Sequence, residues 1–264
     1  MARVEVTITD RVAEVALARP DKKNALDIAM FEEIAAAGEA LKRDGDVRAV
    51  VLTGRGDDFC AGLDLSLFRT LATDLDRLRT GLFDLAPGEV ANFFQKPAHV
   101  WRELPVPVIA ALSGVVFGGG LQIALGADIR IAAPTARLSV MEIRWGLIPD
   151  MGITRALPRL TRIDVATDLL VTGRIVEAEE ARGLGLVTRL AEDPLAAAHA
   201  LARDIAGRSP DAVRRVKTLL DRTWEASAAD ALRLEAALQA EIIGAPAQLE
   251  AVAAALAGRT PNFP

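Results

Sequence analysis

The sequence predicts an α/β fold in which strands and helices alternate along the chain and stack in layers. Residues 3–9 and 12–18 alternate apolar and polar side chains, as half-buried strands do. Residues 28–44 carry apolar side chains at helical spacing, and residues 47–54 and 105–114 form short apolar runs bounded by glycine or proline. Strands separated by helices indicate a layered sheet with parallel pairing.

The first elements follow from local signals. Asp10 and Arg11 separate two alternating segments, which predicts a β-hairpin. Asp27 is expected to cap the helix that follows it, because a carboxylate there can accept a backbone N–H of the first turn. The expected buried face of this helix consists of Ile28, Phe31, Ile34 and Leu41.

The later elements are less regular. Residues 127–133 and 136–140 have the character of short strands, and helices are expected within residues 66–104. From about residue 193 the chain is rich in alanine and has helical periodicity. We therefore expect a core over residues 1–192 and a C-terminal helical segment over residues 193–264.

Composition restricts the class of protein. The chain has 264 residues, is 51% hydrophobic and has a formal net charge of −5, with no long run of one sign. This balance gives no reason to expect binding to nucleic acid or to an anionic membrane surface. The apolar runs are too short to span a bilayer, no targeting segment is evident, and a single cysteine excludes an intramolecular disulfide. We expect a cytoplasmic protein.

The residue types also restrict the chemistry. The chain has no tyrosine, and His99 and His199 are its only histidines. Neither histidine lies in a nucleophile motif, and no cysteine–histidine spacing typical of a metal site occurs. Acid–base catalysis would therefore depend on carboxylates.

Two glycine-containing turns follow expected strands: FCAGLDL at residues 59–65 and SGVVFGGGLQIALG at residues 113–126. Glycine permits close backbone approach to a ligand, and a helix N-terminus offers unpaired N–H groups. Such turns suit stabilisation of a developing oxyanion. Tight packing of a strand against a helix is the alternative explanation of the glycine triplet.

An ordered set of motifs extends over the whole chain. In order they are NAL (24–26), FCAGLDL (59–65), PVIAALSGVVFGGG (107–120), ADIRIAA (127–133), MEIRWGLIPDMG (141–152), TGRIVEAEEARGLGLV (172–187) and GRTPNF (258–263). This set resembles the crotonase superfamily, the enoyl-CoA hydratase/isomerase family. The resemblance implies a spiral of ββα units, a C-terminal helical segment that forms a homotrimer or a dimer of trimers, and an acyl-CoA substrate. It implies no cofactor beyond the coenzyme A of the substrate.

The resemblance also implies roles for individual residues. The backbone N–H groups of Leu63 and Gly119 would hold the thioester oxygen. The expected coenzyme A contacts are Ala25, Ala61, Gly62, Asp64, Leu65 and Gly118, together with Arg259 and Phe263, which in this family often act across a subunit boundary. A plain surface tail is the alternative for Arg259 and Phe263.

Three polar residues define the expected chemistry. Hydratases of the family hold water between two glutamates, and this chain has Glu142 at one of those positions and Gln122 at the other. An amide does not carry protons at neutral pH, so isomerisation of a double bond through Glu142 alone is favoured over hydration. Pairing with Arg144 or Arg137 is the structural alternative for Glu142. Asp150 resembles an acid of dienoyl-CoA isomerases, and it is equally suited to cap a following helix.

Three classes of function remain open from the sequence. The favoured one is an enzyme of fatty-acyl-CoA metabolism that isomerises a double bond through a stabilised enolate. Hydration by a rearranged acid pair and acyl-CoA binding without catalysis are the alternatives. The third class, a nucleotide-binding α/β protein of another fold, is the most remote.

Overall fold

A computed structural model describes residues 2–67, 75–85 and 87–263. Its larger sheet contains β1 (Val4–Thr9), β2 (Val12–Leu17), β3 (Ala49–Gly54), β4 (Val108–Leu112), β6 (Ile129–Ala132) and β9 (Arg189–Leu190), in that spatial order. The smaller sheet contains β5 (Val115–Phe117), β7 (Arg137–Ser139) and β8 (Val176–Glu177). The β1–β2 pair is the expected antiparallel hairpin, and all later pairs of the larger sheet are parallel.

The described helices of the core range from four to 16 residues. They are α1 (Ile28–Arg43), α3 (Leu75–Gly81), α4 (Lys96–Glu103), α5 (Gly119–Gly126), α6 (Ile153–Ala156), α7 (Ile163–Thr172) and α8 (Ala178–Gly183), with 3-10 turns η1 (Pro20–Lys22), η2 (Glu142–Trp145) and η3 (Leu157–Arg159). Helices α3 and α4 fall within the expected helical stretch 66–104, of which residues 68–74 and 86 lie outside the described residues.

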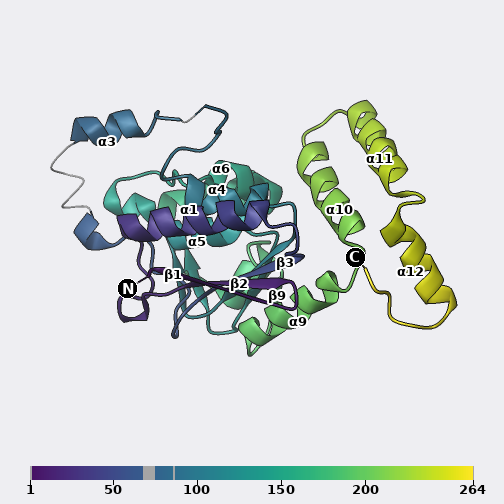
Figure 1. Cartoon of the computed structure of the whole chain (residues 1–264). Helices are drawn as coiled ribbons and strands as arrows, with labels where there is room; N and C mark the ends of the chain where they lie inside the picture. Colours follow the sequence, from purple (N-terminus) through teal and green to yellow (C-terminus); the bar gives the residue numbers. More distant parts are fainter. Residues whose placement is uncertain (1, 68–74, 86, 264) are drawn as a thin grey trace.

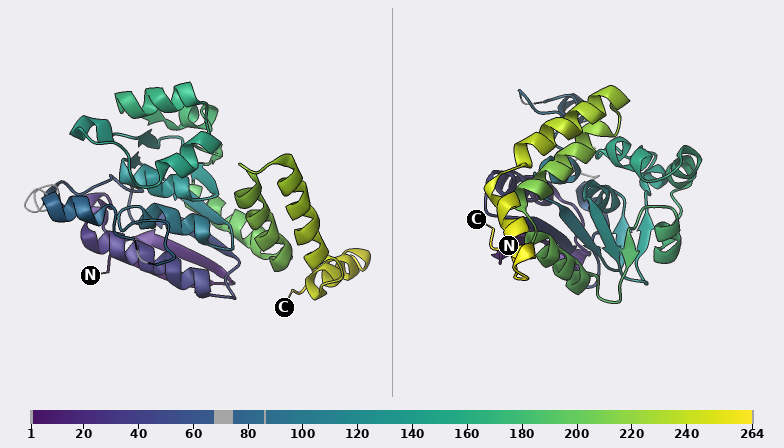
Figure 2. Two further views of the ribbon diagram at one scale, coloured as in Figure 1. Left: turned by 90° about the horizontal axis from the view of Figure 1, so that it is seen from above. Right: turned by 90° about the vertical axis from the view of Figure 1, so that its right-hand side faces the viewer.

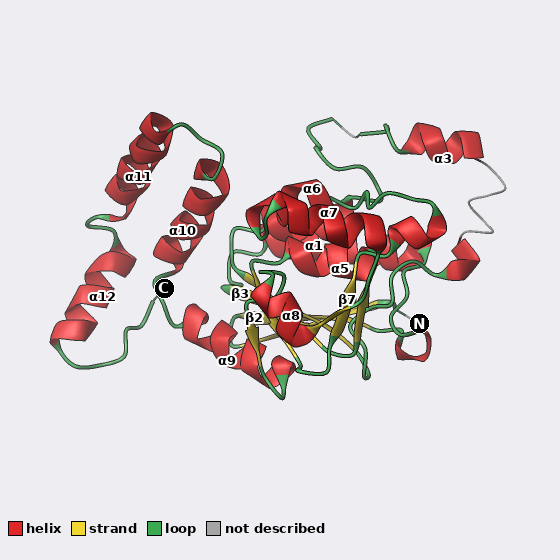
Figure 3. Ribbon diagram, turned by 180° about the vertical axis from the view of Figure 1, so that it is seen from behind, coloured by secondary structure: helices red, strands yellow, loops and turns green. Residues whose placement is uncertain are grey.

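The chain winds as a spiral. Strand β4 pairs in the larger sheet, β5 pairs in the smaller sheet, and helix α5 follows; β6 and β7 repeat the two strand steps one turn later. These two turns each contribute one strand to each sheet, as expected for ββα units, whereas β1 and β2 both belong to the larger sheet. Figure 3 shows the helical layer formed by α1, α5, α6 and α7 over the strands.

Two apolar layers hold the larger sheet between helices. Side chains of β2, β3 and β4 that point to one face pack with α1, α4 and α5, and the alternate side chains pack under α9 (Pro194–Ala206). Figure 1 shows α9 on the opposite face of the sheet from α1, α4 and α5. Strands β2, β3 and β4 therefore bury side chains on both faces of the sheet, as central strands of a parallel sheet do.

Helix α1 begins as predicted. Asp27 accepts a hydrogen bond from the Met30 N–H at 2.9 Å, and Phe31 and Ile34 are buried. The expectation that Ile28 is buried is wrong, because this side chain is 36% exposed. Ile28 is the first residue of α1.

The C-terminal helices project from the core. They are α10 (Pro210–Thr223), α11 (Ala228–Ile242) and α12 (Pro246–Leu256), which stand to one side of the core in the left view of Figure 2. Lys217 of α10 attaches this unit through its Nζ, which donates to Trp101 O, Val106 O and Asp128 Oδ2 at 3.1, 2.9 and 2.8 Å. The projecting part begins at α10, because α9 packs on the sheet; the functional division at residue 192 stays a prediction.

Candidate active site

The candidate site lies beyond the carboxyl ends of β3 and β4, where parallel sheets usually hold their ligands. The loop after β3 lies against β5: Cys60 N–H donates to Val115 O at 3.1 Å, and Phe117 N–H donates to Cys60 O at 2.9 Å. The two glycine-containing turns found in the sequence, far apart along the chain, are therefore neighbours.

The first predicted donor is the Leu63 N–H. The Gly62 carbonyl accepts from the Leu26 N–H at 2.8 Å, so it points toward Leu26. In a trans peptide the carbonyl and the following N–H point in opposite directions. The Leu63 N–H therefore faces away from Leu26.

The second predicted donor, the Gly119 N–H, is oriented in the same way. The Gly118 carbonyl accepts from the Gln122 N–H at 3.1 Å, within the first turn of α5. The Gly119 N–H consequently points outward from the helix N-terminus, where backbone donors lack intrahelical partners. A methyl carbon added at Gly62 would lie 3.5 Å from Gly118 Cα, so the two turns that carry the donors touch.

The structure brings Glu142 and Gln122 into direct contact. Gln122, buried in α5, donates from Nε2 to Glu142 Oε1 at 2.6 Å, and its Oε1 accepts the Met151 N–H at 2.9 Å. Glu142 Oε2 is buried and has no hydrogen-bond partner among the described residues. A methyl carbon added at Gly118 would lie 3.5 Å from Glu142 Oε1, so the carboxyl sits beside the second predicted donor.

The surroundings of Glu142 change its acidity. Burial raises the pKa of Glu142, the Gln122 hydrogen bond opposes that rise, and the charge of Asp150 adds to it. Among the described residues no arginine forms an ion pair with Glu142, in contrast to the alternative of a partner at Arg144 or Arg137. A carboxyl with a raised pKa suits proton transfer near neutral pH.

Asp150 lies close enough to Glu142 for its charge to raise the pKa of that carboxyl. Its pKa is raised because neighbouring atoms restrict solvation of the carboxyl, although the residue as a whole is exposed. The alternative that Asp150 caps a helix is wrong: helix α6 begins at Ile153, and its N-cap is Gly152. No structural cap therefore accounts for this carboxyl.

The loop expected to contact coenzyme A is held in place by a backbone hydrogen bond to Lys23 and by an ion pair with Arg19. Ala61 N–H donates to Lys23 O at 2.9 Å, and the Ala25 carbonyl accepts from Arg19 at 3.1 Å. Asp64 pairs with Arg19 at 2.6 Å. Bonds from Ser66 and then from Arg19 lower the pKa of Asp64 to about 2, so this side chain braces the loop. Leu65 is 58% exposed, free of the core and available to a ligand.

Arg259 and Phe263 lie elsewhere in this chain. Arg259 pairs with Glu250 at 2.6 Å, and the Phe263 carbonyl accepts from Arg48 at 3.2 Å. Arg48 directly precedes β3, and the candidate site lies beyond the other end of this strand. At the usual rise of a strand, the two ends of β3 are roughly 20 Å apart. Neither residue is therefore placed at the site of its own chain, and a coenzyme A contact across a subunit boundary stays a prediction.

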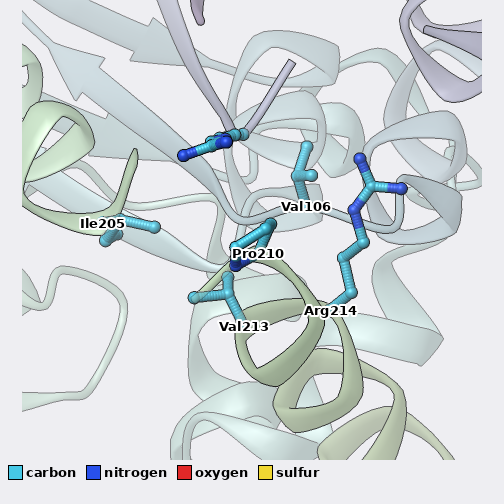
Figure 4. Close-up of a pocket in the computed structure, with 6 residues that line it drawn as sticks. Val106, Ile205, Pro210, Val213 and Arg214 are labelled. Atoms are coloured by element: carbon cyan, nitrogen blue, oxygen red, sulfur yellow. The ribbon is translucent and has the colours of Figure 1, made fainter. Parts of the chain in front are cut away.

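A shallow pocket lies near this C-terminal contact. Figure 4 shows it between α9 and α10, with Val106, Ile205, Pro210, Val213 and Arg214 around it. Arg48 also lines it, which places the pocket at the start of β3 and apart from the candidate site.

Sequence reasoning missed two residues that shape the site. The Met151 N–H orients the Gln122 amide, and backbone donors leave no mark in a sequence. Asn24 is fully buried with φ +54° and donates from Nδ2 to Arg55 O and Asp58 O at 3.0 and 2.8 Å. The position of Asn24 in the NAL motif was the sequence signal that could have identified this residue. Cys60 packs beneath the loop as expected, and burial raises the pKa of its thiol to about 12.

Over the described ranges, no helix is long and apolar enough to cross a membrane. The described His, Cys, Asp and Glu side chains form no group of three or more that is placed to hold a metal ion.

Comparison with known proteins identifies the family. The sequence profile of the enoyl-CoA hydratase/isomerase family matches residues 7–263. A probable enoyl-CoA hydratase of Mycobacterium leprae is 36% identical over 258 residues, which cover 96% of this chain and 94% of the relative. A mitochondrial enoyl-CoA hydratase domain-containing protein of Mus musculus is 35% identical over 262 residues, covering 96% and 84%.

Solved structures agree with the sequence comparison. A crystal structure of an enoyl-CoA hydratase from Streptomyces coelicolor superposes with a TM-score of 0.90 at 37% identity, covering 99% of this chain and 94% of that one. An enoyl-CoA hydratase/isomerase from Mycobacterium abscessus gives 0.90 at 32% identity, covering 99% of both chains. The resemblance to the crotonase superfamily is thereby confirmed, and the chain belongs to the enoyl-CoA hydratase/isomerase family.

Proposed function

We propose that the protein isomerises the double bond of an acyl-CoA thioester, with Glu142 as its single proton-transfer group. The observation that carries the proposal is the partner of Glu142, which is an amide where a second acid would be needed to activate water. The other oxygen of this carboxyl, Glu142 Oε2, is buried and has no hydrogen-bond partner among the described residues. One carboxylate is sufficient to take a proton from one carbon and return it to another.

The backbone donors supply the other half of the mechanism. In this proposal the thioester oxygen accepts the N–H groups of Leu63 and Gly119, which stabilise the negative charge of a dienolate. Glu142 removes the α-proton of a 3-enoyl thioester, the electrons of that bond move toward the oxygen, and the proton returns at the γ-carbon. The double bond then lies between the α- and β-carbons. Atoms and charge balance, and no cofactor is needed besides the coenzyme A of the substrate.

Hydration is the second candidate. One observation favours it: the charge of Asp150 acts on Glu142, and both carboxyl groups have a raised pKa. Such a pair could hold a water molecule in a rearranged version of the two-acid arrangement. The two candidates differ in their products, because hydration adds one water to the acyl chain and isomerisation adds nothing.

The test is product analysis with purified protein. We would supply 2-enoyl-, 3-enoyl- and 3,5-dienoyl-CoA of short and medium chain length, and identify products by mass spectrometry and NMR. A moved double bond at unchanged mass supports isomerisation, whereas addition of water supports the pair of Glu142 and Asp150. Binding without turnover of any substrate would contradict both and support a binding protein.

A further inference from the structure

The Gln122 amide has one orientation in this site, and two neighbours determine it. Met151 offers only a backbone N–H, which requires an acceptor, and that acceptor is Gln122 Oε1 at 2.9 Å. The Glu142 carboxylate is an acceptor and requires a donor, which is Gln122 Nε2 at 2.6 Å. Exchanging the oxygen and nitrogen of the amide would place donor against donor and acceptor against acceptor.

This orientation makes the two oxygens of Glu142 unequal. Oε1 is occupied by the Gln122 amide, and Oε2 is buried without a partner in the described structure. We infer that Gln122 is a positioning residue: it holds Oε1 and so makes Oε2 the one oxygen of Glu142 that accepts and returns the substrate proton. This inference rests on the proposed function in that it assigns the proton of the same reaction to one atom.

The arrangement fits both protonation states of the base. When Glu142 is charged, the amide stabilises the carboxylate by a charge-assisted hydrogen bond. When Oε2 carries the proton, Oε1 is a carbonyl oxygen and still accepts the same N–H. A proton on Oε1 would instead face an N–H, so the Oε2–H form is the favoured neutral state.

Charged groups around the pair are few, which simplifies the test. Helix α5 carries no ionisable side chain, and Asp150 is the described charge that acts on Glu142. Gln122 lines a cavity of about 10 Å³ that is also lined by His99 and Arg102 of α4. Burial lowers the pKa of His99, and Arg102 pairs with Asp221 at 2.7 Å. On α7, which contacts η2, Asp168 pairs with Arg174 at 2.7 Å.

The test measures the carboxyl of Glu142 directly, without reference to turnover. Protein labelled with ¹³C at the glutamate carboxyls is titrated by NMR, and the Glu142 resonance is assigned with Glu142→Gln. Gln122→Met keeps the size of the side chain and removes its N–H donor. We expect the midpoint of Glu142 to rise by about 1–2 pH units, the value that corresponds to losing a hydrogen bond to a buried charge.

Two further variants make the result decisive. Gln122→Glu places a second carboxyl against Glu142, and the apparent midpoint is expected to rise here too. Gln95→Met is the matched control, a glutamine-to-methionine change in a half-buried residue that bonds the Asn92 N–H; it should leave the midpoint unchanged.

An unmoved midpoint in folded Gln122→Met, or in Gln122→Glu if the first variant does not fold, would overturn the inference. The titration stays informative if the protein turns out to be a hydratase. Failure of the proposed function and failure of this inference are therefore distinguishable.

Discussion

At the scale of single residues, the account depends on the environment of Glu142. Because its pKa is raised by burial, the charged base is lost as the pH falls through a value above the ordinary 4.5 of a glutamate. The rate should therefore decline on the acid side at a higher pH than an exposed glutamate would give.

Asp150→Asn tests the electrostatic part of that shift. Removing a nearby negative charge makes the charged form of Glu142 less unfavourable, so the acid limb of the pH–rate profile should move to lower pH. The profile of kcat between pH 4 and 8 measures this shift. A limb at the wild-type position would show that Asp150 does not act on Glu142.

Gln122→Glu supplies the carboxylate that the family resemblance implies for a hydratase at this position. If the absent acid is what limits hydration, this variant should add water to 2-enoyl-CoA, which product masses would show. A folded variant with no hydration would indicate that the pocket itself differs from that of a hydratase.

Sequence alone predicted the identities at this site but not their contacts. The family resemblance singled out Glu142 and Gln122, whereas their 2.6 Å hydrogen bond comes from the fold. From the sequence, Asp150 suits either catalysis or a helix cap. The structure excludes the cap, because α6 begins at Ile153 and its N-cap is Gly152. The Met151 N–H has no sequence signature at all.

At the scale of elements, the contact between the two glycine turns decides where the donors lie. Gly62 has φ +86°, and a methyl carbon there would lie 2.8 Å from Phe117 O, a backbone atom with little freedom to move. Gly62→Ala should lower the free energy of unfolding by about 1–3 kcal/mol and lower kcat, because it displaces the Leu63 N–H.

Gly88→Ala is the matched control for this change. Gly88 has nearly the same backbone angle, φ +84°, but nothing lies within 4 Å of the added carbon. Gly88→Ala should lower the free energy of unfolding only by the cost of a positive φ, and it should leave kcat unchanged. Equal effects of the two substitutions in denaturant unfolding and in kinetics would contradict a role for the packed turn.

The elements themselves were largely predictable from the sequence. The hairpin, the Asp27 cap and the buried runs at β3 and β4 carry strong local signals. Pairing of Cys60 with Val115 and Phe117 joins segments more than 50 residues apart, and only the spiral topology specifies it.

At the scale of the whole molecule, the projecting helices leave apolar side chains exposed. Leu220 of α10 and Trp224, the C-cap of that helix, are each 58% exposed, and Leu232 of α11 is 64% exposed. The family resemblance predicts that a homotrimer or a dimer of trimers covers such surfaces. In such an assembly the exposed Arg259, which pairs with Glu250 in its own chain, would contact the site of a neighbouring chain.

Light scattering after size-exclusion chromatography measures this prediction. The wild-type protein should have the mass of three or six chains of 28.0 kDa, and Leu220→Asp with Trp224→Arg should shift it toward single chains. A wild-type monomer would contradict the predicted assembly and the role proposed for Arg259.

The central claim is that Glu142 alone moves the substrate proton. The most direct measurement compares wild type with Glu142→Ala on 3-enoyl-CoA, following the product by NMR and the retained affinity by calorimetry. The account predicts a product of unchanged mass with a moved double bond, a loss of about 10²–10⁴-fold in kcat for the variant, and nearly unchanged binding. Turnover of Glu142→Ala at the wild-type rate, or a hydrated product, would contradict it.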